Sequence, residues 1–214
     1  MARPARVSPD RILAAAALEF SERGYAGARV DRIARRARVN KAMLYYHFAS
    51  KQGLYRTLLR QTFGAIAAQL QEIAASPALD SPAKLDAAVA ALAAHIEAHR
   101  TFPSIMLREV ADGGTHLDPE TLEALAAVPK AFAAILRPGI ANGAFRDMHP
   151  IAAYFTTIAP ILMFVASSPV RKQIVSGKAV QLPGPPLATA TFLADLTTSL
   201  QRAFAAAPAR QRRS

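Results

Sequence analysis

The segment from Arg29 to Lys51 constrains the fold most, because it contains two short helical patterns and the start of a third helix. The first pattern places apolar residues at the three- and four-residue spacing of one helix face, at Val30, Ile33, Ala34 and Ala37. Arginines occupy the remaining faces. The pattern therefore predicts a small helix with one buried side and one basic side.

The second pattern predicts another short helix from Lys41 to Phe48. Asn40 is predicted to cap it, because its side-chain oxygen can accept from the backbone N–H groups of the next turn. Leu44 and Phe48 are directed inward. The outward residues are basic, aromatic or slim, and they are Lys41, Ala42, Met43, Tyr45, Tyr46 and His47. Such a face fits a DNA major groove, so the two helices are predicted to form a helix-turn-helix.

The string Leu-Tyr-Tyr-His-Phe-Ala-Ser-Lys at 44–51 resembles the N-terminal domain of the tetracycline-repressor-like (TetR/AcrR) family of one-component transcriptional regulators. Helix, turn, aromatic pair and Ser-Lys follow the family order over roughly the first sixty residues. The resemblance implies that four residues face the bases, namely Lys41, Ala42, Met43 and Tyr46. It also implies that Tyr45, His47 and Lys51 hold the phosphate backbone. Arg29 and Asn40 complete the predicted DNA-binding set.

Two positions depart from the family pattern. The family usually begins its second helix with a Thr or Ser cap, and Ala28 stands at that place, so a side-chain acceptor is lost. Arg29 is expected to substitute for it electrostatically. The family turn usually carries Gly before the recognition helix, and Arg38 stands there. We expect either a slightly different turn or tolerated strain at Arg38.

Positive charge is concentrated at the two ends of the chain. Residues 1–60 contain 13 Lys and Arg against 4 Asp and Glu, residues 61–209 contain 10 against 11, and residues 210–214 contain 3 against none. A basic head on a near-neutral, apolar body is typical of a DNA-binding protein that carries a second function. The absence of cysteine excludes disulfides and thiolate metal sites, and it is compatible with a reducing cytoplasm.

The rest of the chain predicts an all-α protein. A first helix starts at Ser8-Pro9-Asp10 and stops at Gly24, and a long helix capped by Ser50 runs from about Lys51 to Ala75. The buried stripe of the long helix changes side partway along it. We therefore expect this helix to carry ligand signals to the helix-turn-helix, the alternative being a plain spacer.

Proline and capping signals predict the remaining helices, which start near Pro82, Phe102, Pro119, Pro150 and Pro186. Ser81 and Asp118 are the expected caps of two of them. The predicted organisation has a three-helix DNA-binding domain at 1–52, a helical ligand-binding and dimerisation domain at 53–206, and a basic disordered tail at 207–214. A flexible connector is expected at 176–186.

The helices from Pro150 to about Ser167 and from Pro186 onward present more apolar surface than one core requires. We predict that they form a homodimer interface, a four-helix bundle built from two helices of each copy, as the family resemblance also implies. A symmetric dimer predicts a palindromic operator. Residues 148–170 lack charged side chains, but three prolines, paired threonines and a serine pair favour a buried helix over a membrane span.

Large apolar side chains of the body are candidate walls of a pocket for a small, apolar effector that releases DNA. They are Phe102, Met106, Phe132, Phe155, Met163 and Phe164. Taken singly, each is more typical of a plain core residue. His95 and His99 have a spacing that could ligate zinc, but the metalloprotease order and a third ligand are missing, so we expect no metal.

We find no strand pattern, glycine-rich phosphate loop or Ser/His/Asp arrangement, so we expect neither an enzyme nor a cofactor. The apolar run Ile12–Leu18 is too short for a secretion signal and is followed at once by Glu19. The favoured interpretation is a cytoplasmic, ligand-responsive repressor. One alternative is an architectural protein that binds all DNA alike, and another is a lipid- or membrane-surface-binding protein acting through 148–170.

Overall fold

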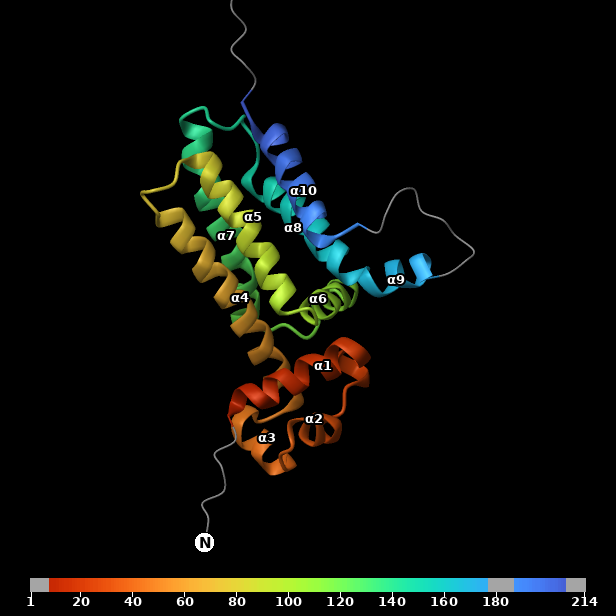
Figure 1. Ribbon diagram of the computed structural model, residues 1–214. Coiled ribbons are helices and arrows are strands. Elements are labelled where there is room, and N and C mark those ends of the chain that lie inside the picture. The colour runs from red at the N-terminus through yellow and green to blue at the C-terminus, as the bar shows by residue number, and fades with distance from the viewer. Residues whose placement is uncertain (1–7, 177–186, 207–214) are drawn as a thin grey trace, which may run out of the picture. The chain divides into compact units, whose positions relative to one another are not determined.

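The computed structural model describes residues 8–176 and 187–206, and these ranges contain ten α-helices and no β-strand (Figure 1). The predicted all-α fold is confirmed. The helices are α1 (Pro9–Gly27), α2 (Val30–Ala37), α3 (Lys41–Phe48), α4 (Lys51–Ala75), α5 (Ser81–Ala98), α6 (Phe102–Ala111), α7 (Pro119–Ala141), α8 (Pro150–Ala166), α9 (Ser168–Ser176) and α10 (Thr189–Phe204). The expected tail at 207–214, nearly all of the connector and the expected helix start at Pro186 lie outside the described residues.

The chain divides into two compact units. The first consists of Met1–Gly64 and His99–Leu125, and the second of Ala65–Ala98 and Ala126–Ser214. Helices α4 and α7 each begin in the first unit and end in the second. The domain boundary expected after residue 52 lies at the end of the helix-turn-helix motif, whereas the first compact unit continues to Gly64. The expected boundary stays a prediction.

Helix α1 begins and breaks where the sequence indicates. The Ser8 hydroxyl accepts from the Asp10 backbone N–H at 3.2 Å, with Pro9 at the first helical position. Phe20 is buried on the inner face of the helix. Gly24 has φ 69°, a left-handed conformation that interrupts the helix before its last three residues. The expected stop at Gly24 is therefore a break within α1.

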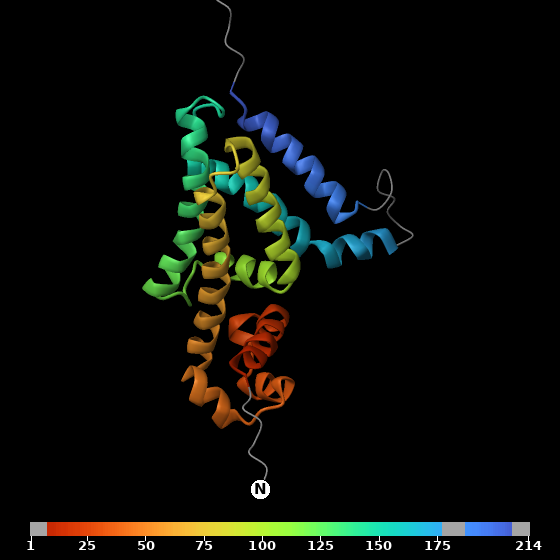
Figure 2. The same cartoon turned by 60° about the vertical axis from the view of Figure 1, so that its left-hand side comes forward.

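Helices α1, α2 and α3 form one cluster, visible as the red and orange ribbons in Figures 1 and 2. Their inward residues are buried as predicted and include Ile33, Ala34, Ala37, Leu44 and Phe48. The turn into α4 is tight. The Ser50 hydroxyl accepts from the Gly53 N–H at 2.9 Å, and a Cβ at Gly53 would lie 2.2 Å from the Phe48 carbonyl oxygen. Only glycine fits there without a shift of the backbone.

A buried carboxylate ties helices of the first unit together. Glu109 of α6 is 1% exposed, and its carboxylate accepts from the Tyr55 hydroxyl of α4 at 2.7 Å. The His116 backbone N–H donates to the same carboxylate at 3.1 Å, and the His116 ring nitrogen Nδ1 lies 3.0 Å from it. Burial and the bond to Glu109 raise the pKa of the Tyr55 hydroxyl. A buried charge is tolerated only with such partners.

Aromatic rings pack around this carboxylate. The Tyr55 ring lies 4.8 Å from the ring of Phe20 and 5.1 Å from that of Tyr25, both on α1, measured between centroids. The Tyr25 ring also lies 4.0 Å from the His116 ring. Residues from α1, α4, α6 and the loop after α6 therefore meet in one mixed polar and aromatic core.

The start of α7 is held by charge within the same unit. Asp118 caps the helix by accepting from the Thr121 N–H at 2.9 Å, as predicted. Arg56 and Arg60 of α4 lie 3.3 and 3.5 Å from its carboxylate. The bonds from Thr121 and the two guanidinium groups lower the pKa of Asp118.

In the second unit, α5 packs against α8 and α10. The predicted core stripe of α5 is buried at Leu85, Val89, Leu92 and Ile96. The cap of this helix was predicted wrongly. Asp80 accepts from the Ala83 N–H at 2.8 Å, and Ser81 is the first helical residue. The aspartate one position earlier takes the capping role because its carboxylate reaches the N–H three residues ahead.

Helix α8 begins at Pro150 as predicted and ends at Ala166, and α9 continues from it after a bend of 53°. The bent pair and α7 are each long and apolar enough to cross a membrane by length and composition alone, a property that buried core helices share.

We predict that Tyr55→Phe lowers the free energy of unfolding by about 1.5–3 kcal/mol, because a hydrogen bond to a buried carboxylate is lost. Urea unfolding followed by circular dichroism measures the change. Tyr154→Phe is the matched control. Burial raises the pKa of Tyr154 to about 12, but its hydroxyl makes no hydrogen bond to any described residue. Equal effects of the two substitutions would contradict the role given to Glu109.

Candidate DNA-binding site

The turn between α2 and α3 is built on a left-handed arginine. Arg38 has φ 54° and ψ 47°, and its backbone N–H donates to the carbonyls of Ala34 and Arg35. The Val39 N–H also donates to the Ala34 carbonyl at 2.9 Å, which completes the end of α2. The chain therefore keeps the left-handed turn and tolerates a side chain where glycine is easiest.

The predicted departure at Ala28 needs a correction. The N-cap of α2 is Arg29, which makes no side-chain capping bond, and Ala28 is buried at the end of α1. The Arg29 backbone N–H instead donates to the carboxylate of Glu19 on α1 at 3.3 Å. Glu19 is itself buried and lies 3.9 Å from the Arg32 guanidinium. A distant carboxylate thus takes over part of the cap, and the sequence pattern gave no sign of it.

Helix α3 presents the face that the sequence predicts. Asn40 caps it by accepting from the Met43 N–H at 2.8 Å. Tyr46 is 82% exposed, and Lys41, Ala42 and Tyr45 are also exposed. Met43 and His47 are half-buried, and the His47 Nε2 atom is buried without a hydrogen-bond partner among the described residues. The exposed side of α3 is therefore short, slim near its start and aromatic near its end.

Lys51 has a structural role that sequence reasoning missed. Its ammonium donates to the carbonyls of Tyr25 at 2.8 Å, Ala28 at 3.1 Å and Ala26 at 3.5 Å. It also lies 4.5 Å from the centre of the Tyr25 ring. All three of its N–H bonds point at the end of α1, which attracts positive charge. Lys51 therefore holds the end of α1 to the start of α4. Its predicted phosphate contact stays a prediction.

The carboxylates of the first three helices leave several arginines uncompensated. Glu22 pairs with Arg36 at 3.0 Å, and the bond lowers the pKa of Glu22. Asp31 pairs with Lys41. The side chains of Arg29, Arg35 and Arg38 are exposed and form no ion pair with any described residue. Exposed positive charge beside an exposed helix is the electrostatic signature of a nucleic-acid-binding surface.

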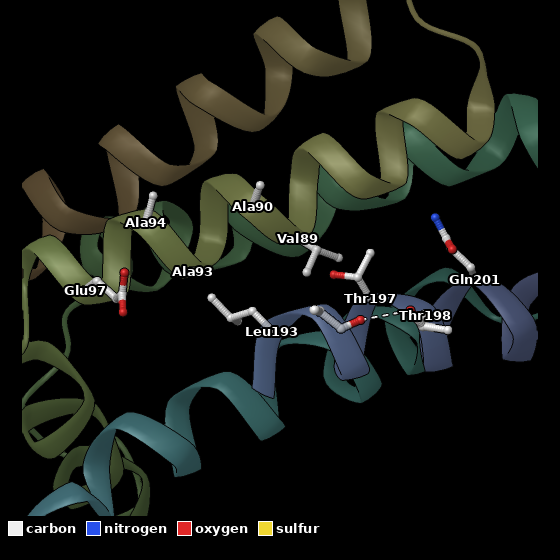
Figure 3. A pocket seen from close by; sticks show the side chains of 10 residues that line it. Val89, Ala90, Ala93, Ala94, Glu97, Leu193, Thr197, Thr198 and Gln201 are labelled. Atoms are coloured by element: carbon white, nitrogen blue, oxygen red, sulfur yellow. Dashed lines mark hydrogen bonds between the residues drawn. The ribbon is translucent and has the colours of Figure 1, made fainter. Parts of the chain in front are cut away.

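The second unit contains an open groove between α5 and α10, with a volume of about 460 Å³ (Figure 3). Its walls are mostly small or apolar, and Glu97 lies at one end. None of the six predicted effector residues lines this groove. The lining residues are Val89, Ala90, Ala93, Ala94, Glu97, Leu193, Ala194, Thr197, Thr198 and Gln201.

The predicted effector residues divide between the two compact units and differ in burial. Phe102 and Met106 are buried in the first unit, and Phe132 and Phe164 are buried in the second. Phe155 and Met163 are exposed on α8. The effector role of all six residues stays a prediction.

We expect His95 and His99 to bind no metal. His95 belongs to the second compact unit and His99 to the first. Within residues 8–176 and 187–206, no group of three or more His, Cys, Asp or Glu side chains could hold a metal ion.

Two short helices joined by a left-handed turn, with an exposed second helix beside exposed arginines, define a helix-turn-helix DNA-binding protein. Residues 12–58 match the family model of the bacterial regulatory proteins, tetR family. The chain is 31% identical over 166 residues to the HTH-type transcriptional repressor NicS of Pseudomonas putida, an alignment that covers 74% of this chain and 76% of NicS. The chain therefore belongs to the tetR family of bacterial transcriptional regulators, as its sequence resemblance implied.

Solved structures agree with this fold. The ketosteroid transcriptional regulator KstR2 of Mycobacterium tuberculosis superposes with a TM-score of 0.71 at 22% identity, covering 96% of this chain and 98% of KstR2. The transcriptional regulator FadR of Bacillus subtilis, solved with stearoyl-CoA, gives a TM-score of 0.69 at 18% identity, covering 91% of this chain and 96% of FadR. At these identities the likeness concerns the fold alone.

We predict that Arg38→Gly raises the free energy of unfolding by about 0.5–1 kcal/mol, because glycine removes the steric cost of the left-handed conformation. The greater entropy of the unfolded chain with glycine offsets part of this gain. Thermal and urea unfolding measure the change. Arg38→Ala loses the same charge but keeps the penalty, so it should bring no gain. A stabilisation of equal size in both variants would point to relief of charge repulsion instead.

Proposed function

We propose that the chain is a repressor that binds a palindromic operator as a homodimer through α3 and releases it when a small apolar effector binds. The observation that carries this proposal is the exposed face of α3, on which Tyr46 is 82% exposed, set on a helix-turn-helix with exposed arginines beside it. The name of NicS, a repressor, favours the same direction of regulation. We further propose that the protein acts in the cytoplasm as a regulator and not as an enzyme, because the relatives that it matches are named as transcriptional repressors.

The face that we assign to DNA combines two kinds of contact. Lys41, Ala42, Met43 and Tyr46 lie at or near the exposed surface of α3, where they can meet base edges in the major groove. Arg29, Tyr45 and His47 would hold the sugar-phosphate backbone. Asn40 fixes the start of α3 through its capping bond. Lys51 supports the same surface through its bonds to α1.

The dimer interface that we propose is an apolar stripe on α8. Its residues recur at three and four positions and are all exposed, namely Ala152, Phe155, Thr156, Ala159 and Met163. Phe155 is 60% and Met163 57% exposed, which is unusual for large apolar side chains without a partner. Only Leu200 and Phe204 of α10 are buried, so this helix also has surface left to cover. Two copies of α8 and α10 would bury both surfaces in a four-helix bundle.

The effector would bind in the helical body and act on DNA by a shift between two states. Four of the predicted residues are apolar and buried, Phe102 and Met106 in the first unit and Phe132 and Phe164 in the second, so small displacements within either unit could open a cavity for an apolar molecule. FadR, a structure of the same fold, was solved with stearoyl-CoA, which has a long apolar chain. Helix α4 is one unbroken helix of 25 residues that belongs to both compact units, so it is the path that we propose for the signal.

Selection of bound duplexes from a random pool, followed by sequencing, tests the DNA-binding part. The expected result is one palindrome with half-sites about one or more helical turns apart, roughly 34 Å per turn. Recovery of unrelated duplexes would instead support an architectural role.

We predict that Tyr46→Ala weakens binding to the selected operator by about 5- to 150-fold, because one good base contact is worth roughly 1–3 kcal/mol. Fluorescence anisotropy with a labelled duplex measures the loss. Leu18→Ala removes another exposed apolar side chain of the same unit, on α1, and should leave the affinity unchanged. Unaltered operator binding by Tyr46→Ala would remove α3 from the proposed reading face.

We predict that Phe155→Arg converts the dimer to a monomer, because a charge would be buried without a partner in the bundle. Light scattering coupled to size-exclusion chromatography measures the mass in solution. Val110→Arg is the control, since Val110 is 65% exposed on α6 and lies outside the stripe. A wild-type chain that elutes as a monomer at all concentrations would overturn this part of the proposal.

A further inference from the structure

The four carboxylates of the first three helices have different partners. Asp10 lies beside its own cap residue Ser8, with 2.9 Å between the hydroxyl and the carboxylate. Glu19 is buried at the start of α2 and Glu22 pairs with Arg36 of α2. Asp31, in the first turn of α2, pairs with Lys41, the first residue of α3. Among the described residues, this is the ion pair that reaches the helix assigned to DNA reading.

The pair holds a flexible cation at the start of α3. The side chains of Asp31 and Lys41 are 43% and 55% exposed, so both groups are open to an incoming ligand. Helices α2 and α3 pack against each other, which keeps the carboxylate next to the ammonium. An ammonium has three donors, so it can keep one bond to Asp31 and direct the others at a base edge, where guanine offers two acceptors.

We propose that Asp31 is a specificity-determining residue that restrains Lys41 and suppresses binding to non-operator DNA. The inference rests on the proposed function, because it assumes that α3 contacts DNA. Non-specific affinity comes from cations that neutralise phosphates and release counterions. Because Asp31 already neutralises Lys41, this lysine adds little to the number of cations that neutralise phosphates. Its contact with a base edge, by contrast, forms only on the operator.

The Asp31 charge also acts directly on the duplex. A carboxylate beside the reading helix repels every phosphate, whatever the base sequence. On the operator, Asp31 also orients Lys41 toward the bases, and this gain, which depends on Asp31, offsets the repulsion. On any other duplex Lys41 makes no such base contact, so Asp31 lowers the affinity for non-operator DNA more than the affinity for the operator.

The test compares Asp31→Asn with the full-length wild type on the selected operator and on a scrambled duplex of equal length. Asparagine keeps the shape and removes the charge. We expect the scrambled duplex to bind more tightly, with a salt slope steeper by about 0.9, the value for one more phosphate contact. The affinity ratio between about 50 and 200 mM salt should then grow by about 3-fold. Operator affinity should change by less than about 2-fold, so the specificity ratio falls.

Two further variants isolate the cause. Glu22→Gln makes the same change in net charge and releases Arg36, so an equal gain on the scrambled duplex would overturn the proposal in favour of net charge alone. Adding Lys41→Met to Asp31→Asn should abolish the extra salt slope. Persistence of the slope would show that Asp31 does not act through Lys41.

The outcomes separate this inference from the proposed function. A wild type that binds no duplex removes both. A wild type that selects an operator, together with an Asp31→Asn variant whose two affinities are unchanged, overturns the role of Asp31 and leaves the repressor proposal standing. Thermal melting by circular dichroism verifies that the variants are folded. If Asp31→Asn does not fold, Asp31→Ser gives the same comparison.

Discussion

The buried carboxylate of Glu109 is the interaction on which the first compact unit depends. A charge without solvent must be hydrogen-bonded, and its donors come from α4 and from the loop after α6. Since Tyr55 packs on Phe20 and Tyr25, the requirement to satisfy one carboxylate also fixes the end of α1 against α4. Helix α1 in turn packs against α2, and α2 against α3. The position of α3 therefore depends, through α1 and α2, on the contact between Tyr55 of α4 and Glu109 of α6.

Local signals made most of the fold predictable. The capping roles of Ser8, Asn40, Ser50 and Asp118 depend on atoms within three residues, so sequence order alone reveals them. Long-range partners were not predictable in this way. Glu109 is 54 residues from Tyr55, and Lys51 is 26 residues from Tyr25. A lysine after the motif has the same sequence pattern whether it bonds to backbone carbonyls, as Lys51 does, or faces phosphate.

The candidate site shows the same division. The exposed face of α3 follows from helical periodicity, which also identifies Leu44 and Phe48 as core. The body is harder, because α8 is apolar on nearly all sides and periodicity then says little about which side is buried. Phe155 and Phe164 look alike in the sequence, yet one is exposed and the other buried. The Phe164 ring stacks on Phe192 of α10 at 4.0 Å between centroids and lies 3.8 Å from the Arg171 guanidinium of α9, and these contacts are not visible in the sequence.

The three bonds from Lys51 have a consequence for covalent modification. Acetylation of this amine would remove its charge and two of its three N–H donors. The carbonyls at the end of α1 would lose their partner, and the contact with the Tyr25 ring would weaken with the lost charge. A modifying enzyme acting there would weaken the attachment of α1 to the start of α4, without altering any side chain on the exposed face of α3.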